Sequence, residues 1–316
     1  MTEQRIDQPV VVTGANGLVG SHVCAALAER GVAVRAVVRR SGTAPALDGV
    51  TEVVGEFTDP AQAPGLVEGA AALVTTVHPM GTGRATQEQV GVEGTTTIAT
   101  AAREAGVGLL MHVSTASVYD RRAGVGDVDE SADPVPDDAG DYPVTKRDTD
   151  ARLEVLDGPT RVLVRPPVIL GPGESSLWNT LRPRAMAEDP AEAHATPDLT
   201  FAWVHVTDLA RLVGDVVTGA VPIGEDPEAG PVAGEVTAVN AAAGASTFRH
   251  YLETVTTALG VEPTWDDGPA WQGRVVSERA RAWGWQPQVS LEQAFRELVE
   301  DLPEVVPGAV SGTSRS

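Results

Sequence analysis

The chain has 316 residues, of which 42% are hydrophobic and 21% are charged, and this balance is typical of a globular protein with ample core. Its net charge of −21 at pH 7 argues against nucleic acid or an anionic lipid surface as a partner, because no basic patch is available to offset phosphate repulsion. A single cysteine, Cys24, excludes an intramolecular disulfide framework, and the sequence shows neither a signal peptide nor an apolar run of about 18 residues. These features predict a cytoplasmic protein with no membrane contact.

Short apolar runs typical of buried strands alternate with helical patterns in the first half of the chain. The predicted strands cover residues 9–14, 32–40, 50–57, 71–77, 108–119 and the start of 161–170. We expect a helix at 18–31, closed by Gly31, and a longer helix near 84–105. Strand–helix–strand alternation at this spacing predicts parallel pairing with right-handed crossovers, and therefore an α/β fold with a doubly wound Rossmann parallel sheet.

The second half of the chain is less regular. Residues 120–140 are acidic and rich in Gly and Pro, which indicates a surface loop beside the site. We expect a Rossmann core over residues 1–170, rejoined by about 201–218 and 236–240. The remaining segments are expected to form a smaller, discontinuous C-terminal substrate lobe: 171–200, 219–235 and 241–306. Residues 307–316 are expected to be a disordered tail.

The turn after the first predicted strand has the sequence TGANGLVG, with Gly14, Gly17 and Gly20 at regular spacing. The first glycine permits a tight turn, and the second lets backbone N–H groups approach a pyrophosphate at the helix N-terminus. The third allows the helix to sit close to the sheet. Because the triplet lies between the first strand and the first helix, it predicts a dinucleotide site rather than merely a tight turn.

The end of the second predicted strand selects between NAD and NADP. An acidic residue there would hold a ribose 2′-hydroxyl, whereas arginine accepts a 2′-phosphate. The segment AVVRRSG carries Arg39 and Arg40, and no carboxylate follows until Asp48. The pair therefore favours NADP(H) over NAD(H), with Arg39 the first choice; the alternative is a solvated basic pair.

The segment DYPVTKRDTD contains Lys146, the only lysine among the 23 lysines and arginines of the chain. Tyr142 lies four residues earlier, so both share one face of a helix in which Pro143 suits the first turn. A phenol has a pKa near 10, and lowering it by three units requires about 4 kcal/mol. A cation at ~4 Å with an effective dielectric of ~20 supplies about that much, so we expect Lys146 to lower the pKa of Tyr142.

These motifs resemble the extended short-chain dehydrogenase/reductases, the NAD-dependent epimerase/dehydratase family. The resemblance extends over essentially the whole chain and includes TGANGLVG, STASVY, YPVTK, RPPVILGPG at 165–173 and WVHVTDLA at 203–210. It implies that Tyr142 is the general acid/base, that Lys146 binds ribose and supports the phenol, and that Thr115 polarises the substrate carbonyl. Ser114 is the neighbouring candidate for that last role.

The resemblance also implies which residues contact the dinucleotide. They are Gly14, Asn16, Gly17, Leu18, Gly20, Arg39, Arg40, Glu56, Phe57, Val77, Lys146 and Pro166.

Three positions depart from the family pattern. Glu56 stands where an aspartate is commoner, and Gly91 stands where the long fourth helix usually carries an asparagine. His78 falls close to the expected nicotinamide, where it either touches substrate or is incidental. Trp178 and Trp203 lie in the variable lobe, where each either lines a pocket or serves packing. No ligand spacing for a metal is present in the sequence.

The leading functional hypothesis is a reductase that moves hydride between NADPH and a small-molecule ketone or aldehyde. Nucleotide-sugar epimerases and dehydratases with tightly bound NAD also resemble the chain, but they commonly carry an asparagine soon after Arg165, where this chain has Pro166 and Pro167. A cofactor-sensing regulator of the same fold is a third hypothesis, although such proteins often lose the tyrosine–lysine pair. The resemblance further implies a homodimer packed through the helices near 84–105 and 142–157.

Overall fold

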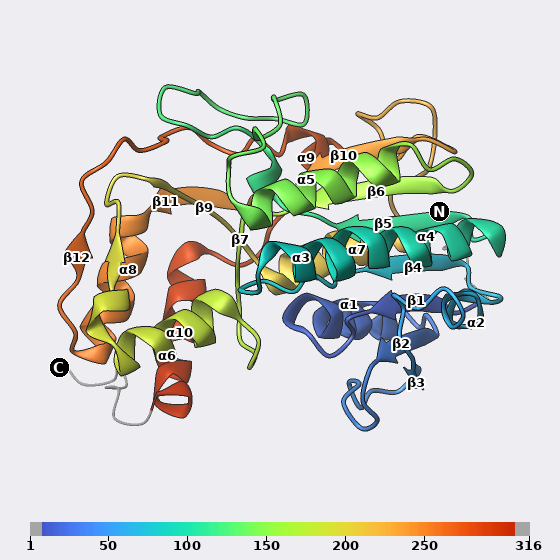
Figure 1. Ribbon diagram of the computed structural model, residues 1–316, viewed down its shortest axis with the longest axis horizontal. Helices are drawn as coiled ribbons and strands as arrows, with labels where there is room; N and C mark the ends of the chain where they lie inside the picture. Colours follow the sequence, from blue (N-terminus) through green and yellow to red (C-terminus); the bar gives the residue numbers. More distant parts are fainter. Residues whose placement is uncertain (1–7, 307–316) are drawn as a thin grey trace.

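A seven-stranded parallel sheet forms the centre of the computed structural model, which describes residues 8–306 (Figure 1). Its strands are β1 (Val10–Thr13), β2 (Val34–Val38), β3 (Val50–Val54), β4 (Ala72–Thr75), β5 (Leu109–Val113), β6 (Thr160–Arg165) and β10 (Val236–Asn240). Their order is β10-β6-β5-β4-β1-β2-β3, and every neighbouring pair is parallel. The prediction of a doubly wound Rossmann sheet is therefore confirmed.

Helices cover both faces of this sheet. The helices nearest to it are α1 (Leu18–Glu29), α2 (Ala63–Val67), α4 (Thr95–Glu104), α5 (Asp141–Glu154), α7 (Val206–Val217) and α9 (Glu278–Ala282). Side chains alternate along each strand, so Val10 and Val12 of β1 pack in one core with α1 and α7, while Val11 packs in the other with α2 and α4. Burial on both faces explains why the strands are continuous apolar runs.

A smaller lobe stands at one end of the sheet, on the left in Figure 1. It contains β7 (Val168–Leu170), β8 (His194–Ala195), β9 (Thr200–His205), β11 (Gly244–Thr247), β12 (Thr264–Trp265), α6 (Arg182–Glu188), α8 (Phe248–Leu259) and α10 (Leu291–Val305). Strands β11, β9 and β7 form a three-stranded sheet, and β12 pairs with β8. The lobe has its own aromatic core, in which the rings of Phe201 and Tyr251 stack at 4.9 Å.

Several elements begin or end differently from their predicted ranges. The strand predicted at 108–119 ends at Val113, because the Thr115 side chain accepts a hydrogen bond from the Ser117 amide and starts the short 3₁₀ helix η2 (Ala116–Val118). The helix predicted near 84–105 consists of α3 (Arg84–Gln87), the π-helical turn η1 (Glu88–Gly94) and α4.

Two expected core segments also take other partners. Strand β6 ends at Arg165, and the chain beyond Pro166 and Pro167 continues as β7 in the three-stranded sheet. Strand β9, which begins the segment expected to rejoin the core at 201–218, pairs with β7 and β11, whereas α7 of the same segment packs on α1. The predicted tail at 307–316 lies outside the described residues.

Candidate active site

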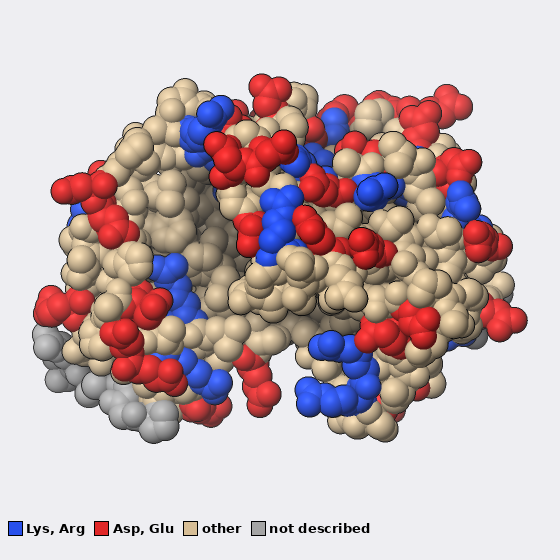
Figure 2. All heavy atoms as spheres, viewed as in Figure 1, with Lys and Arg blue, Asp and Glu red and all other residues tan. Residues whose placement is uncertain are grey.

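A cavity of about 1040 Å³ opens at the carboxyl edge of the central sheet, where the strand order reverses between β1 and β4. In Figure 2 the molecule is hollowed between the smaller lobe and the sheet. Ligands of open parallel sheets bind at such a reversal point. We call the part lined by the turns after β1, β2, β3 and β4 the sheet half, and the part lined by the smaller lobe and the segment after η2 the lobe half.

The glycine turn after β1 forms the floor of the sheet half. Gly14 has a φ of +71°, and a Cβ there would lie 2.7 Å from Val77 Cγ2 on the neighbouring turn. A Cβ on Gly20 would lie 2.1 Å from the Gly14 carbonyl oxygen, so α1 can start this close to the turn only with glycine at that position. Gly17, which precedes the first residue of α1, has no side chain to cap the helix, and the Leu18 amide donates to the Ser175 hydroxyl at 2.9 Å. The turn thus leaves room for an anion at a helix end whose first N–H groups have no partner within the helix.

The two arginines after β2 line the sheet half and are exposed, and neither forms an ion pair with a carboxylate of residues 8–306. Glu52 of β3 accepts hydrogen bonds from the amides of Gly42, Thr43 and Ala44 in the loop after these arginines. These bonds lower the pKa of Glu52, and its carboxylate does not line the cavity. Glu56 lines the same half of the cavity, but it forms no ion pair with Arg39 or Arg40.

Most of the other residues predicted to contact the dinucleotide line the cavity. They are Asn16, Leu18, Glu56, Phe57 and Val77. Pro166 does not line it, because this residue is buried and its carbonyl accepts a hydrogen bond from the Ala116 amide; the next residue, Pro167, lines the cavity in its place.

Helix α5 begins at Asp141, so Tyr142 lies in its first turn with its half-buried ring in the cavity wall. The Thr115 hydroxyl lies beside the phenol and also lines the cavity. Ser114 does not line the cavity; its hydroxyl is buried beside Asp150. Burial raises the pKa of Asp150, and the charge of Arg165 and the Ser114 hydroxyl oppose this rise in part. The structure thus brings Thr115, and not Ser114, together with Tyr142.

The lowering of the Tyr142 pKa by Lys146 stays a prediction, because the charge of Lys146 is not among the effects that act on Tyr142 in this structure. The pKa of Tyr142 is raised, chiefly because the ring is buried; the Thr115 hydroxyl and the charge of Arg121 lower it only in part. The Lys146 ammonium lies behind the cavity wall and donates to the Val113 carbonyl at 2.7 Å, at the end of β5. Burial lowers the pKa of Lys146 to about 8.

A buried polar chain continues from Lys146 into the core. Asp150, one turn further along α5, raises the pKa of Lys146 in part and accepts a hydrogen bond from Arg165 Nε at 2.9 Å. Arg165 Nη1 donates to the Tyr119 hydroxyl at 3.0 Å, and that hydroxyl donates to Asn240 Oδ1 at 2.8 Å. This chain joins α5 to the ends of β6 and β10, and it fixes the helix that carries Tyr142.

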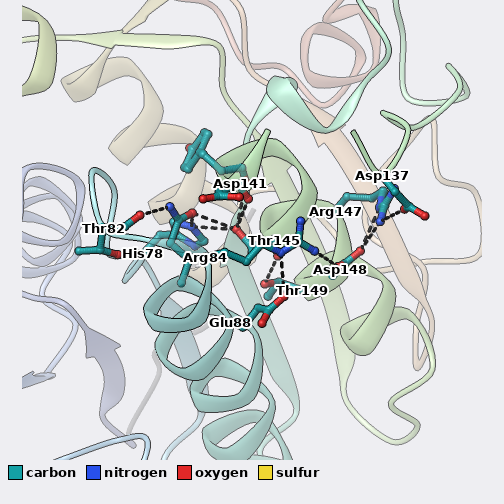
Figure 3. Close-up of polar contacts among 12 residues, drawn as sticks. His78, Thr82, Arg84, Glu88, Asp137, Asp141, Thr145, Arg147, Asp148 and Thr149 are labelled. Carbon is teal, nitrogen blue, oxygen red and sulfur yellow. Dashed lines mark hydrogen bonds and ion pairs between the residues drawn. The ribbon is translucent and has the colours of Figure 1, made fainter. Parts of the chain in front are cut away.

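His78 lies at the boundary between the two halves, with its ring edge-on to Tyr142 at 5.1 Å. Its Nε2 lies 3.0 Å from Gln87 Oε1 and 3.3 Å from the Thr145 hydroxyl, and Figure 3 shows Thr145 of α5 pointing toward His78. Because the Gln87 amide nitrogen donates to the Thr82 carbonyl, its oxygen faces His78, so Nε2 carries the imidazole proton.

The departures at positions 78 and 91 belong to one arrangement. A Cβ on Gly91 would lie 2.7 Å from His78 Nδ1, so the imidazole occupies the space that a side chain on the helix would need. Gly91 lies in the π-helical turn η1, which faces α5. The sequence indicated each departure, but not that one residue makes room for the other.

The lobe half is lined mainly by apolar and aromatic side chains. Trp178 is half-buried in its wall, in edge-to-face contact with Phe248 at 5.8 Å, whereas Trp203 is buried in the core of the lobe and does not line the cavity. The sequence prediction missed Arg121 and Trp271, which also line the lobe half. Both lie in segments without periodicity, so no local pattern could have indicated them.

No group of three or more His, Cys, Asp or Glu side chains able to hold a metal ion occurs within residues 8–306. Over the same residues, no helix has the length and apolar character needed to cross a membrane.

Comparisons with known proteins agree with this geometry. A family model described as the NAD dependent epimerase/dehydratase family matches residues 10–222. A 4-hydroxy-2-methyl-3-oxo-4-farnesyl-3,4-dihydroquinoline-1-oxide ketoreductase of Stigmatella aurantiaca is 33% identical over 52% of this chain and 52% of its own length. A 2-alkyl-3-oxoalkanoate reductase of Stenotrophomonas maltophilia is 31% identical over 56% and 55%. The chain thus spans about half the length of the curated relatives it matches.

Solved structures match nearly the whole chain at low identity. The UDP-glucose 4-epimerase of Thermotoga maritima, with UDP-glucose, has a TM-score of 0.73 at 18% identity, covering 94% of this chain and 99% of that chain. A putative epimerase of Burkholderia cenocepacia has a TM-score of 0.73 at 19% identity, covering 95% and 100%. At such identities these structures show that the fold is shared.

Proposed function

The chain belongs to the NAD dependent epimerase/dehydratase family, as its motifs predicted, and we propose that it is an NADP(H)-dependent reductase of a small-molecule ketone or aldehyde. The observation that carries this proposal is the position of the Tyr142 phenol. It lies beside the Thr115 hydroxyl, between a glycine turn suited to a dinucleotide and a lobe half lined mainly by apolar side chains.

The sheet half fits a dinucleotide. A Cβ on Gly14 or Gly20 would fill the turn, so the glycines keep backbone N–H groups accessible to a pyrophosphate. Arg39 and Arg40 support NADP(H) over NAD(H), because they line the cavity at the end of β2 and form no ion pair with a carboxylate of residues 8–306. Glu56 and Phe57 would contact the adenine side of the dinucleotide.

The residues of the chain would act on the carbonyl as follows. A bound reduced nicotinamide supplies the hydride that adds to the carbonyl carbon. Thr115 donates a hydrogen bond to the carbonyl oxygen and stabilises the charge that develops there. Tyr142 then gives its proton to that oxygen, which completes the alcohol, and the phenolate regains a proton from solvent.

Lys146 contributes from behind the cavity wall. Its ammonium holds the Val113 carbonyl at the end of β5, two residues before Thr115, and Asp150 helps to keep it charged. In this proposal Lys146 is a positioning residue for Thr115, and its contact with the ribose stays a prediction. The predictions of a homodimer and of a cytoplasmic location also stay predictions; the helices expected to form the dimer face, α4 and α5, lie side by side on one face of the sheet (Figure 1).

The printed names of the two curated relatives, a ketoreductase and an oxoalkanoate reductase, support the reduction of a carbonyl group. The epimerases among the similar structures share the fold at less than 25% identity. Phosphates of a nucleotide sugar require cationic partners, and Arg121 is the only charged side chain among the described residues that line the lobe half. The lining therefore favours the reductase over the epimerase.

The test is oxidation of NADPH, followed by absorbance, with a panel of aromatic and aliphatic ketones and aldehydes. Tyr142→Phe should lower kcat/KM at least ~100-fold, because general acid catalysis contributes about that much. Thr115→Val should lower it by about 100-fold, as expected for loss of a donor to the developing oxyanion. Ser114→Ala is the matched control and should stay within a few-fold of wild type, because this hydroxyl lies outside the cavity.

Full turnover by Tyr142→Phe would contradict the proposed mechanism. Conversion of a UDP-sugar without added cofactor, together with no activity on any carbonyl compound, would show an epimerase instead.

A further inference from the structure

Arg121 is a cation in the wall of the lobe half that forms no ion pair with a carboxylate of residues 8–306. The adjacent Arg122 does pair, with Asp120 at 2.6 Å. Arg121 is half-buried, and partial removal from water lowers its pKa, an effect that Tyr142 partly opposes. A guanidinium in this position gains from an anion that enters the cavity.

The surroundings of Arg121 hold it in one orientation. Its Nη2 donates to the Ser117 hydroxyl at 3.1 Å, and its guanidinium carbon lies 5.3 Å from the centre of the Trp271 ring. Trp271 is fixed in turn, because its indole N–H donates to the Gly126 carbonyl at 2.9 Å. A guanidinium has five N–H donors, and only one is used by the protein here. Its other donors are therefore available to a ligand.

Arg121 lies close to the residues proposed to hold the reacting carbonyl, Thr115 and Tyr142. The Ser117 amide donates to Thr115 Oγ1 at 3.1 Å, so Thr115, Ser117 and Arg121 follow one another on the turn that leaves β5. The charge of Arg121 is close enough to Tyr142 to lower the pKa of the phenol in part. An anionic group bound by Arg121 would therefore lie on the side of the cavity that carries Thr115 and Tyr142.

The rest of the lobe half suits an uncharged, apolar chain. Its wall includes Leu177, Trp178, Leu199, Phe248 and Ile169. Burying an apolar chain against such side chains stabilises a complex, because apolar surface is removed from water. The substrate that fits is thus anionic at one end and apolar at the other.

We propose that Arg121 binds the carboxylate of the substrate, so that the enzyme reduces 2-oxo or 3-oxo acids whose remaining chain is apolar. The planar guanidinium matches a carboxylate through two parallel hydrogen bonds, and one arginine is sufficient for a single negative charge. This inference rests on the proposed reductase function. The reaction itself is unchanged: the ketone carbon gains a hydride, its oxygen gains the Tyr142 proton, and the carboxylate stays intact.

The kinetic experiment compares 4-phenyl-2-oxobutanoate and 3-oxooctanoate with their methyl esters. Wild type should prefer each acid in kcat/KM, and Arg121→Gln should lower kcat/KM for the acids by about 10- to 100-fold, the usual effect of losing hydrogen bonds to a charged group. The esters should change by less than a few-fold. Arg122→Gln, which removes the neighbouring exposed arginine, is the matched control and should leave both classes unchanged.

A binding experiment separates this inference from the proposed function. Octanoate, octan-1-ol and octyl phosphate are each titrated into the protein. Binding is followed by the quenching of tryptophan fluorescence, since Trp178 and Trp271 line the cavity. Octanoate should bind wild type more tightly than octan-1-ol, and Arg121→Gln should remove that difference. If the variant fails to fold, the titrations of wild type still test the inference: equal affinities for octanoate and octan-1-ol would contradict a carboxylate site.

The outcomes are distinct. Reduction of esters and neutral ketones with no preference for acids would overturn the role of Arg121 and leave the reductase intact. Tighter binding of octyl phosphate than of octanoate would overturn the assignment of a carboxylate. Octanoate binding that depends on Arg121, with no reduction of any carbonyl, would support the anion site and overturn the proposed function.

Discussion

The two halves of the cavity are built from different parts of the chain. The sheet half is formed by the turns that follow β1, β2, β3 and β4, and its shape depends on backbone and glycine. The lobe half is formed by side chains that come from distant segments, from Arg121 after η2 to Trp271 after β12. One half is therefore specified by local sequence, and the other by tertiary packing.

This difference indicates which residues of the site can be substituted without a change in the fold. Substituting a residue of the glycine turn alters the backbone that carries the first helix, so the turn is constrained by the fold as well as by its ligand. Substituting Arg121 or Trp178 changes only a side chain that lines the cavity and leaves the backbone around it in place. Structures that share this fold at 18% identity are consistent with such freedom, because function depends on the site more than on the fold.

The largest effect is expected in the sheet half, from Gly20→Ala. Its methyl group would lie 2.1 Å from the Gly14 carbonyl oxygen, so the turn or α1 must shift. We expect the free energy of unfolding to fall by roughly 1–3 kcal/mol. NADPH affinity, measured by calorimetry, should fall about 100-fold or more, because several backbone donors to phosphate move together.

Gly65→Ala is the matched control, since Gly65 lies on the exposed side of helix α2 and a methyl group there meets no atom within 4 Å. This variant should keep wild-type affinity and stability, or gain slightly in stability. If Gly20→Ala bound NADPH as tightly as wild type, the turn would not be the cofactor site. The statement that the sheet half depends on its backbone and glycines would then be wrong.

The sequence predicted the sheet half well. Glycine spacing, the arginine pair and the Tyr142–Lys146 helix depend on residues that are neighbours in the chain, and the structure brings all but Gly20 and Lys146 to the cavity wall. Gly20 is buried against the turn itself, which is the packing that its position in the motif predicts.

Other features depend on how the chain folds and could not be predicted locally. Adjacent residues of an extended segment point to opposite sides, so local pattern alone does not separate Thr115 from Ser114. The family resemblance put Thr115 first, and Thr115, not Ser114, lines the cavity. Likewise, the i, i+4 spacing of Tyr142 and Lys146 is correct, but the ammonium reaches the Val113 carbonyl rather than the phenol. The position of Arg121 near Tyr142 depends on the conformation of the irregular segment that follows η2, which has no local sequence pattern.

A second prediction sharpens the description of the sheet half. Arg39→Ser should lower kcat/KM for NADPH by about 10- to 100-fold, the effect of losing charge-assisted hydrogen bonds to a 2′-phosphate. The value for NADH should change by less than about threefold, because NADH lacks that phosphate. Arg40→Ser is the matched comparison and should have the smaller effect. Equal losses with NADH and NADPH would contradict phosphate recognition by Arg39.

His78 provides the smallest expected effect, at the boundary of the two halves. The pKa of His78 is lowered to about 3, chiefly by burial and also by the charge of Lys146, while the hydrogen bond to Gln87 opposes this shift in part. An unfolded histidine has a pKa near 6.5. Between these values the unfolded chain binds the proton and the folded chain does not, so stability falls as the pH decreases from about 6.5 toward 3.

His78→Asn should therefore lose less stability on acidification than wild type does. One proton taken up only by the unfolded chain corresponds to about 1.4 kcal/mol per pH unit, so the loss between pH 6 and pH 5 should be smaller by about 1 kcal/mol. Urea unfolding at the two pH values measures this difference. His194→Asn, at a histidine whose side chain is half-exposed, is the control and should follow wild type. An unchanged slope in His78→Asn would mean that His78 can be protonated in the folded chain, and the neutral, Nε2-protonated imidazole assigned beside Tyr142 would be wrong.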